Sequence, residues 1–114
     1  MALTGIEPLV RAAGGQIVAI TPELQSFAAE FKAEAGATFP VLTDMDNGYA
    51  LSLNLAIWLG AELRDFFTSR GHDLPRYQGN NAWTVPIPAT FVVGTDGRVK
   101  ARIVDPDYRR GPDI

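Results

Sequence analysis

The residue types that carry most enzyme chemistry are scarce in this 114-residue chain, which contains no cysteine and a single histidine, His72. Without cysteine the chain has no thiolate nucleophile, no disulfide and no thiolate metal ligand. One histidine cannot supply a pair of imidazole ligands for a transition metal. No serine lies in a G-x-S-x-G turn, so a serine hydrolase is not indicated. We therefore expect His72 to be a surface loop residue, and we assign no catalytic residue.

The segment 44–48, Asp-Met-Asp-Asn-Gly, superficially suggests a calcium loop. In such a loop oxygen ligands occupy alternate positions and a glutamate closes the site about twelve residues from the start. Here Gly48 stands at one of the alternate positions and Leu55 stands where the glutamate belongs. Capping of the next helix by Asp46 or Asn47 is the favoured interpretation. We expect neither a metal nor a cofactor in this chain.

Aromatic side chains are the remaining candidates for a binding surface. Trp58, Phe66 and Phe67 fall in segments of helical spacing and are expected to be core residues. Tyr77 and Trp83 lie in a segment without clear periodicity. For these two residues, contact with a ligand or partner and simple packing over the core both remain open.

The first twenty residues predict a helix followed by a strand. Residues 4–13 have apolar side chains at helical spacing, and Pro8 implies that the helix either starts near Glu7 or is kinked. The glycine pair at 14–15 ends the helix. Residues 16–20 form a short apolar run, typical of a central strand that is covered on both faces.

The next segments continue this alternation. A helix is predicted from the Thr-Pro-Glu start at 21–23 to Gly36, with apolar residues at helical spacing. Residues 39–42 predict a short strand at a sheet edge or a strand start, because its proline cannot donate a ladder hydrogen bond. A long helix is predicted from 49 to 58, and residues 61–69 extend or restart it.

The last third of the chain predicts a loop and a hairpin. Residues 72–86 contain prolines, glycine and asparagines without a period, so we expect a long surface connection. Strands at 90–93 and 99–104 flank the turn Gly-Thr-Asp-Gly at 94–97, which lacks the Lys-Ser/Thr of a phosphate-binding loop. The tail 105–114 shows no helical pattern.

Composition limits the classes of partner and compartment. Nearly half of the residues are hydrophobic, and the length suits one domain over residues 1–114. The formal net charge is −3 and charges of both signs alternate along the chain, so we expect no nucleic-acid partner. No segment has the length and apolar character of a membrane span, and we see no targeting signal. A cytoplasmic protein without a membrane partner is the prediction.

Three segments carry a resemblance to a known family. They are 17–22 (Ile-Val-Ala-Ile-Thr-Pro), 39–44 (Phe-Pro-Val-Leu-Thr-Asp) and 85–93 (Val-Pro-Ile-Pro-Ala-Thr-Phe-Val-Val), and Asp-Pro-Asp-Tyr at 105–108 adds to them. Together they resemble the peroxiredoxin-like proteins of the alkyl hydroperoxide reductase and thiol-specific antioxidant group, within the thioredoxin-like superfamily. The resemblance covers nearly the whole chain, although each motif is only moderately specific.

The resemblance implies an α/β fold, a thioredoxin-like three-layer sandwich. In that fold the proline before the last hairpin is cis and lies against the active-site thiols, so Pro88 is assigned to this position and Ile87–Pro88 is expected to be cis. The cleft bordered by Pro88, Trp83 and Tyr77 is then the candidate binding place. Thr84 and Ile87 are further candidate contacts to a ligand or partner.

The resemblance is incomplete where activity depends on it. The family's peroxidatic cysteine lies at the start of the first long helix, after a central strand, and neither has a counterpart in this chain. Many peroxiredoxins place an arginine near the thiolate, where this sequence has Pro88. The family's C-terminal helix has no counterpart either, so the sandwich is expected to be incomplete. Because peroxide reduction needs a thiolate that attacks the O–O bond, we expect no thiol peroxidase activity from the chain alone.

Three hypotheses for function remain. The favoured one is a degenerate, non-catalytic module that binds a protein partner or itself. The second is a cysteine-independent enzyme or small-ligand binder at the cis-proline cleft, and the third is a fragment of an active thiol peroxidase. In the resembling fold the strand without a counterpart lies between residues 17–20 and 90–93, which leaves two apolar strands with unpaired edges. We therefore expect a homo-oligomer, most simply a dimer.

Overall fold

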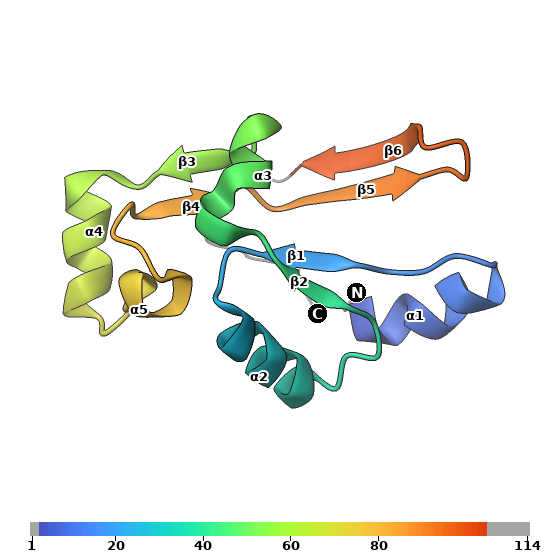
Figure 1. The fold of residues 1–114 in the computed structure, drawn as a ribbon, viewed down its shortest axis with the longest axis horizontal. Coiled ribbons are helices and arrows are strands. Elements are labelled where there is room, and N and C mark those ends of the chain that lie inside the picture. Colours follow the sequence, from blue (N-terminus) through green and yellow to red (C-terminus); the bar gives the residue numbers. More distant parts are fainter. Residues whose placement is uncertain (1–2, 105–114) are drawn as a thin grey trace.

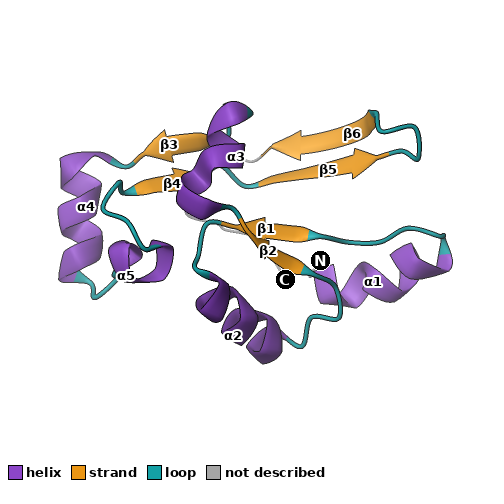
Figure 2. Cartoon of the chain, in the orientation of Figure 1, coloured by secondary structure: helices purple, strands orange, loops and turns teal. Residues whose placement is uncertain are grey.

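The computed structural model describes residues 3–104 as a mixed α/β arrangement in which helices alternate with short strands (Figure 1). The strands form three separate two-stranded sheets (Figure 2). The strand order β1-β2 is parallel, whereas β3-β4 and β5-β6 are antiparallel. The α/β class is therefore confirmed. The predictions for the segment 105–114 lie outside the described residues.

The first helix, α1 (Leu3–Ala12), begins before Pro8 and contains it, so of the two predicted alternatives the start near Glu7 is excluded. The glycine pair ends the helix as predicted, because Gly14 has a φ of +84° and the Gly15 amide donates to the Val10 carbonyl at 2.9 Å. Glu7 is buried and pairs with Arg11 one turn later. This ion pair joins the two turns on either side of the proline.

A parallel strand–helix–strand unit follows, made of β1 (Ala19–Thr21), α2 (Gln25–Ala35) and β2 (Val41–Thr43). The helix ends at Gly36 as predicted, with a left-handed φ of 66° and the Ala37 amide bonded back to the Lys32 carbonyl at 3.1 Å. Its start is three residues later than expected, because Thr21 belongs to the strand. The Pro40 carbonyl accepts from the Ala19 amide at the start of the ladder, which agrees with the predicted strand-start position.

The prediction of a central strand at residues 16–20 is wrong. Strand β1 pairs with β2 only, among the described residues, and Ile20 remains 50% exposed. The apolar run is present, but a second neighbouring strand and a cover over the side chains are missing from the described part of the chain. Burial of such a run on both faces depends on its neighbours, which the run itself does not specify.

The long helix expected over residues 49–58 is also wrong. A one-turn 3-10 helix, η1 (Met45–Asn47), leads into a short helix, α3 (Gly48–Ser52), and the chain then turns at Asn54, whose φ is 57°. Residues after the turn form β3 (Ala56–Trp58), and helix α4 (Gly60–Ser69) restarts beyond it. The left-handed residue breaks the helical path, and pairing with a later strand fixes the extended state.

The stretch 72–86 is not the unstructured connection that was expected. It contains helix α5 (Leu74–Gln78) and strand β4 (Thr84–Pro86). The Asp73 side chain caps the helix by accepting from the Arg76 amide at 3.2 Å, and Gly79 ends it at a φ of 73°. Strand β4 pairs with β3, with Ile57 opposite Val85.

The predicted hairpin is confirmed as β5 (Ala89–Val93) and β6 (Val99–Val104). Thr90 lies opposite Ile103 and Phe91 opposite Arg102, with a register shift near Val93. At the turn the Gly94 amide donates to the Arg98 carbonyl at 2.9 Å, and Gly97 takes a φ of +79°. Strand β5 continues β4 after two residues, so β3 and β6 lie along the same side of one interrupted strand (Figure 1).

The hydrophobic core is small. Three apolar residues are buried among the described ones: Ala28, Phe39 and Leu59. Trp58 is 69% exposed and Phe66 is 50% exposed, so the expectation that these two residues are core is wrong. Their segments turn the rings outward because no described element covers that side of β3 and α4. Within residues 3–104 no helix has both the length and the apolar character that crossing a bilayer requires.

Candidate functional site

The five residues selected from the sequence lie on α5, on β4 and on the link to β5. Tyr77 is on α5, Trp83 precedes β4, Thr84 is within it, and Ile87 and Pro88 connect it to β5. The link residues and β4 are half-buried, and Tyr77 is 39% exposed. Four of the five, all except Pro88, make backbone or ring contacts within the chain.

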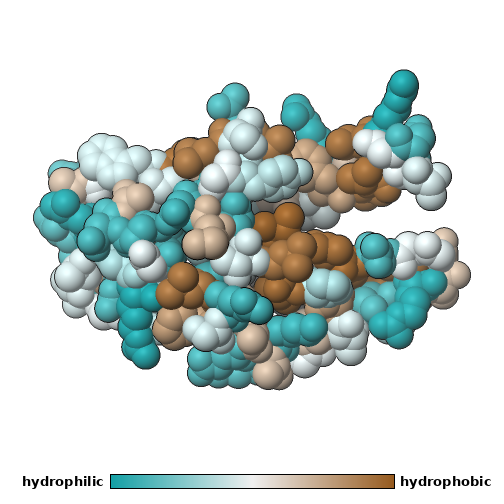
Figure 3. All heavy atoms as spheres, in the orientation of Figure 1, coloured by the Kyte–Doolittle hydropathy of each residue, from teal (hydrophilic) through white to brown (hydrophobic). Residues whose placement is uncertain are grey.

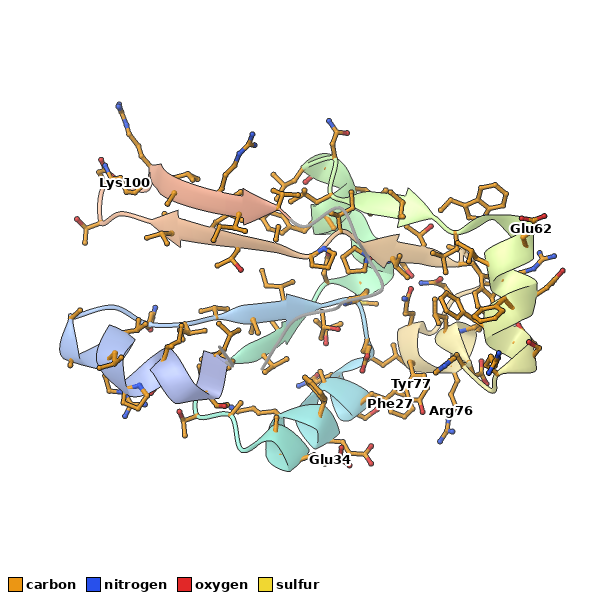
Figure 4. All side chains as sticks on the ribbon, turned by 180° about the vertical axis from the view of Figure 1, so that it is seen from behind. Phe27, Glu34, Glu62, Arg76, Tyr77 and Lys100 are labelled. Carbon is orange, nitrogen blue, oxygen red and sulfur yellow. The ribbon has the colours of Figure 1, made fainter. Side chains whose placement is uncertain are left out.

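Tyr77 belongs to a contact between α5 and α2. Its ring meets the ring of Phe27 edge-on, with centroids 4.7 Å apart, and the guanidinium of Arg76 lies 5.5 Å from the Phe27 centroid (Figure 4). The Tyr77 carbonyl accepts from the Leu24 amide at 2.7 Å. The ring and the carbonyl of Tyr77 thus hold α5 against the start of α2.

Trp83 and Thr84 hold other segments through their backbone. Trp83 has a φ of 52°, and its carbonyl accepts from the Leu59 amide at 3.0 Å. The Thr84 carbonyl accepts from the Asn47 side chain, also at 3.0 Å. These contacts fasten the start of β4 to β3 and η1.

The expected cis peptide before Pro88 is wrong, because residues 3–104 contain no cis peptide bond. The Ile87 amide donates to the Leu55 carbonyl at 2.6 Å, which extends the β3–β4 pairing by one residue. A trans peptide lets the extended backbone of β4 run directly into β5. The position in the sequence that resembles a thiol-facing proline is here a link between two strands.

Asn47 is the centre of a polar junction that sequence reasoning missed; we use this name for Asn47, Gln78 and Thr84. Asn47 is 1% exposed, and its Nδ2 donates to the Thr84 carbonyl and, at 3.4 Å, to Gln78 Oε1. Gln78 is itself buried, while the Asn47 Oδ1 atom has no hydrogen-bond partner in the structure. The junction ties η1, α5 and β4 together, three elements that are far apart in sequence.

The helix cap in this region is also different from the one predicted. Asp44, not Asp46 or Asn47, accepts from the α3 amides, with Oδ1 bound to Tyr49 at 2.8 Å and Oδ2 to Ala50 at 2.9 Å. Asp46 instead accepts from Asn80 Nδ2 at 2.8 Å. Asp44 can reach the amides because the 3-10 turn lies between it and the helix. The described residues hold no group of three or more His, Cys, Asp or Glu side chains placed to bind a metal ion.

A pocket of about 300 Å³ lies away from the predicted cleft, between the end of α1 and the start of β2. Its polar lining includes Glu7, Arg11, Gln16 and Thr38, and its apolar lining includes Ile17 and Phe39. Glu7 and Arg11 already neutralise each other as an ion pair. The pocket is about half open to solvent, and its two charged side chains, Glu7 and Arg11, are already paired with each other.

The feature with the largest binding potential is a hollow between β1 and the β5–β6 hairpin, which we call the open cleft. The space-filling view shows the molecule divided here, with hydrophobic side chains over both walls (Figure 3). Strands β1 and β5 face each other across the cleft without pairing (Figure 1). Every residue of both hairpin strands is exposed. The exposed apolar residues of the strands around the cleft are Val18 and Ile20 at β1, Phe91, Val92 and Val93 on β5, and Val99, Ile103 and Val104 on the outer strand β6.

Two carboxyl groups near the ends of these walls have shifted pKa values. The Lys100 ammonium at 3.0 Å and the Arg98 amide at 3.1 Å lower the pKa of Asp96 in the hairpin turn. Partial burial raises the pKa of Glu23, which follows β1. His72 is an exposed residue after α4, as predicted, with its ring edge-on to Phe67 and the centroids 5.8 Å apart.

Comparison with known proteins adds no relative: no family model, no curated protein and no solved structure matches this chain.

Proposed function

We propose that this chain is a non-catalytic module that binds a polypeptide segment, from a protein partner or a second copy of itself, in the open cleft. The observation that carries the proposal is a pair of open strand edges, one on β1 and one on β5, that face one hollow on strands with exposed apolar side chains. A strand that enters such a hollow gains main-chain hydrogen bonds from the edge and buries alternate side chains on the walls. The cleft therefore has the two properties by which peptides are recognised by strand addition.

The energetics favour a filled cleft. Exposed sheet edges with apolar strands are a liability that proteins normally cover, twist away or protect with charges. With three apolar residues buried among those described, the internal core offers little to offset the conformational entropy of folding. Burial of the cleft walls against another segment would add apolar contact where the described chain lacks it. We infer that binding and folding stability are coupled in this protein.

The family resemblance contributes only the expected arrangement of helices and strands to this proposal. We propose that the module is a degenerate peroxiredoxin-like protein with a thioredoxin-like arrangement. The parallel β1–α2–β2 unit and the antiparallel β5–β6 hairpin are consistent with that arrangement. Without cysteine the chain cannot carry out the family's thiol chemistry alone. The trans peptide at Pro88 weakens the argument for the resemblance and also for a ligand site at that proline.

Hydrogen exchange tests the proposed function. In the isolated chain, diluted until it is monomeric, the β5 amides that point into the cleft should exchange fast, while the Ile87 amide, which is bonded to the Leu55 carbonyl, should exchange slowly. Slow exchange throughout β5 in a verified monomer would mean that the cleft is closed and would contradict the proposal. A parallel assay of hydrogen peroxide consumption with a thiol reductant should not exceed a heat-denatured control. Consumption clearly above that control would overturn the non-catalytic assignment.

A further inference from the structure

The two strands of the hairpin differ in how well their edges are protected. Strand β5 reads Ala-Thr-Phe-Val-Val, with no charged residue, no proline and no glycine. Strand β6 carries Lys100 and Arg102. Charged side chains on an edge strand, lysine especially, oppose the addition of another strand. Of the two hairpin edges, that of β5 is therefore the one open to pairing, and it is the one that faces the open cleft (Figure 1).

We propose that β5 pairs antiparallel with β5 of a second copy of this chain, across a two-fold axis at Phe91. This inference rests on the proposed function and names the occupant of the cleft. The resulting sheet has the order β6-β5-β5-β6. In this register Phe91 lies opposite Phe91 of the other copy, and Thr90 lies opposite Val92. Aromatic and β-branched residues that face each other across strands are favourable pairs, and no charges are brought together.

Pairing through β5 also brings exposed apolar side chains of the two copies together. The three large apolar residues of β5, Phe91, Val92 and Val93, are 38%, 56% and 58% exposed. In an antiparallel pair these side chains lie beside those of the facing strand, so each copy covers part of the apolar surface of the other. A two-fold contact needs one self-complementary surface, and an uncharged strand that pairs with itself provides it.

The test uses sedimentation velocity over a range of micromolar concentrations, with substitutions at exposed positions. Wild type should be a dimer. Val92→Lys places a charge opposite Thr90 of each partner and should raise the dissociation constant at least tenfold. Val92 is 56% exposed, so the substitution should not prevent folding; a urea midpoint shared with the control, at a concentration where both variants are monomeric, verifies this. The matched control is Trp58→Lys, which changes a residue on β3 that is 69% exposed and should leave the dimer intact.

Disulfide trapping supplies a second readout, because the chain is free of cysteine. Phe91→Cys should form an intermolecular disulfide on mild oxidation, since the two copies of position 91 meet at the axis. Ile103→Cys, one strand further out, should not. A dimer that survives Val92→Lys, or that cross-links through position 103 and not 91, would overturn the β5 pairing and leave self-association standing.

A monomeric wild type separates the remaining outcomes. If it is monomeric and its β5 amides exchange fast, the second copy is not the occupant, and the cleft is left for a different protein partner. If it is monomeric and its β5 amides exchange slowly, both the pairing and the proposed function are wrong.

Discussion

The two ends of this molecule are stabilised in different ways. At one end, η1, α3, β3, α4, α5 and β4 are fastened by specific bonds between distant segments, such as Asn47 to Thr84 and Leu59 to Trp83. At the other end, β1 and the β5–β6 hairpin expose apolar strands across the open cleft. The first we call the closed end. The closed end is held by contacts within the chain, whereas the open cleft offers surface to another chain.

Removing the same kind of side chain from the two ends should give the largest contrast. Leu59 is 6% exposed and Ile103 is 72% exposed. Leu59→Ala should lower the free energy of unfolding by about 3 kcal/mol, because it leaves a cavity in a core that is already small. Ile103→Ala should change it by less than about 0.5 kcal/mol in the monomer. Urea unfolding at a concentration where the chain is monomeric measures both, and equal losses would contradict the division into two ends.

The polar junction should be the next most sensitive feature of the closed end. Asn47→Ala removes the donor to the Thr84 carbonyl and places a Cβ-bearing residue without a polar side chain at a φ of 58°. The loss should be about 2 to 3 kcal/mol. Asn47→Gly removes the same hydrogen bonds but tolerates the backbone angle, so its loss should be about 1 kcal/mol smaller. Thermal unfolding of both variants separates the hydrogen bonds from the backbone, and two identical losses would show that strain plays no part.

The cap of α3 should contribute less. Asp44→Ala removes the acceptor for both the Tyr49 and Ala50 amides and should cost about 1 kcal/mol. Asp44→Asn keeps one acceptor oxygen and should lose less than half of that amount. Because α3 is short, hydrogen exchange at residues 49–50 is the direct readout. Unchanged hydrogen exchange at residues 49–50 in Asp44→Ala would contradict a role for the cap. It would mean that the polar junction alone stabilises this part of the closed end.

The smallest effect concerns Glu23, between β1 and α2. Its folded-state pKa is raised by burial, so the folded state favours the protonated carboxyl. The stabilising contribution is thus fully present below the unfolded-state pKa and is lost as the pH rises through the folded-state pKa. Glu23→Gln should therefore raise the free energy of unfolding at neutral pH by less than about 0.5 kcal/mol, which is measured as a slightly higher melting temperature. At pH 3 the variant and wild type should be equally stable. A Glu23→Gln variant that is less stable than wild type at pH 7 would contradict the prediction.

Local signals in the sequence predicted the parts of the fold that local interactions decide. The hairpin follows from alternating β-branched residues on both sides of a turn whose Gly97 takes a positive φ. The end of α2 follows from Gly36. Strand β3 was not predicted because the apolar run at 55–59 was assigned to the preceding helix. Its extended state depends on pairing with β4, much later in the chain. Helix α5 had a recognisable signal, Asp73 before a proline and Gly79 after one turn, but the segment is only five residues long.

The candidate site was predictable only in outline. An unpaired strand edge between the apolar runs at 17–20 and 90–93 was expected, and β1 and β5 are indeed not paired with each other. The cis peptide expected before Pro88 was wrong, because a family position was transferred to a chain whose backbone is trans there. Asn47 could not be selected from its sequence, since Asn-Gly is common in turns, and its burial depends on contacts with Gln78 and Thr84.

The link between β4 and β5 determines how the hairpin can move. Pro88 has a φ fixed by its ring, and the residue before a proline is restricted to extended conformations. The Ile87 amide is in addition bonded to Leu55. Few torsion angles remain free at this link, so we expect the hairpin to keep a fixed orientation relative to the closed end. A hairpin of fixed orientation holds the empty cleft open. The edge of β5 is then preorganised for a strand that binds there.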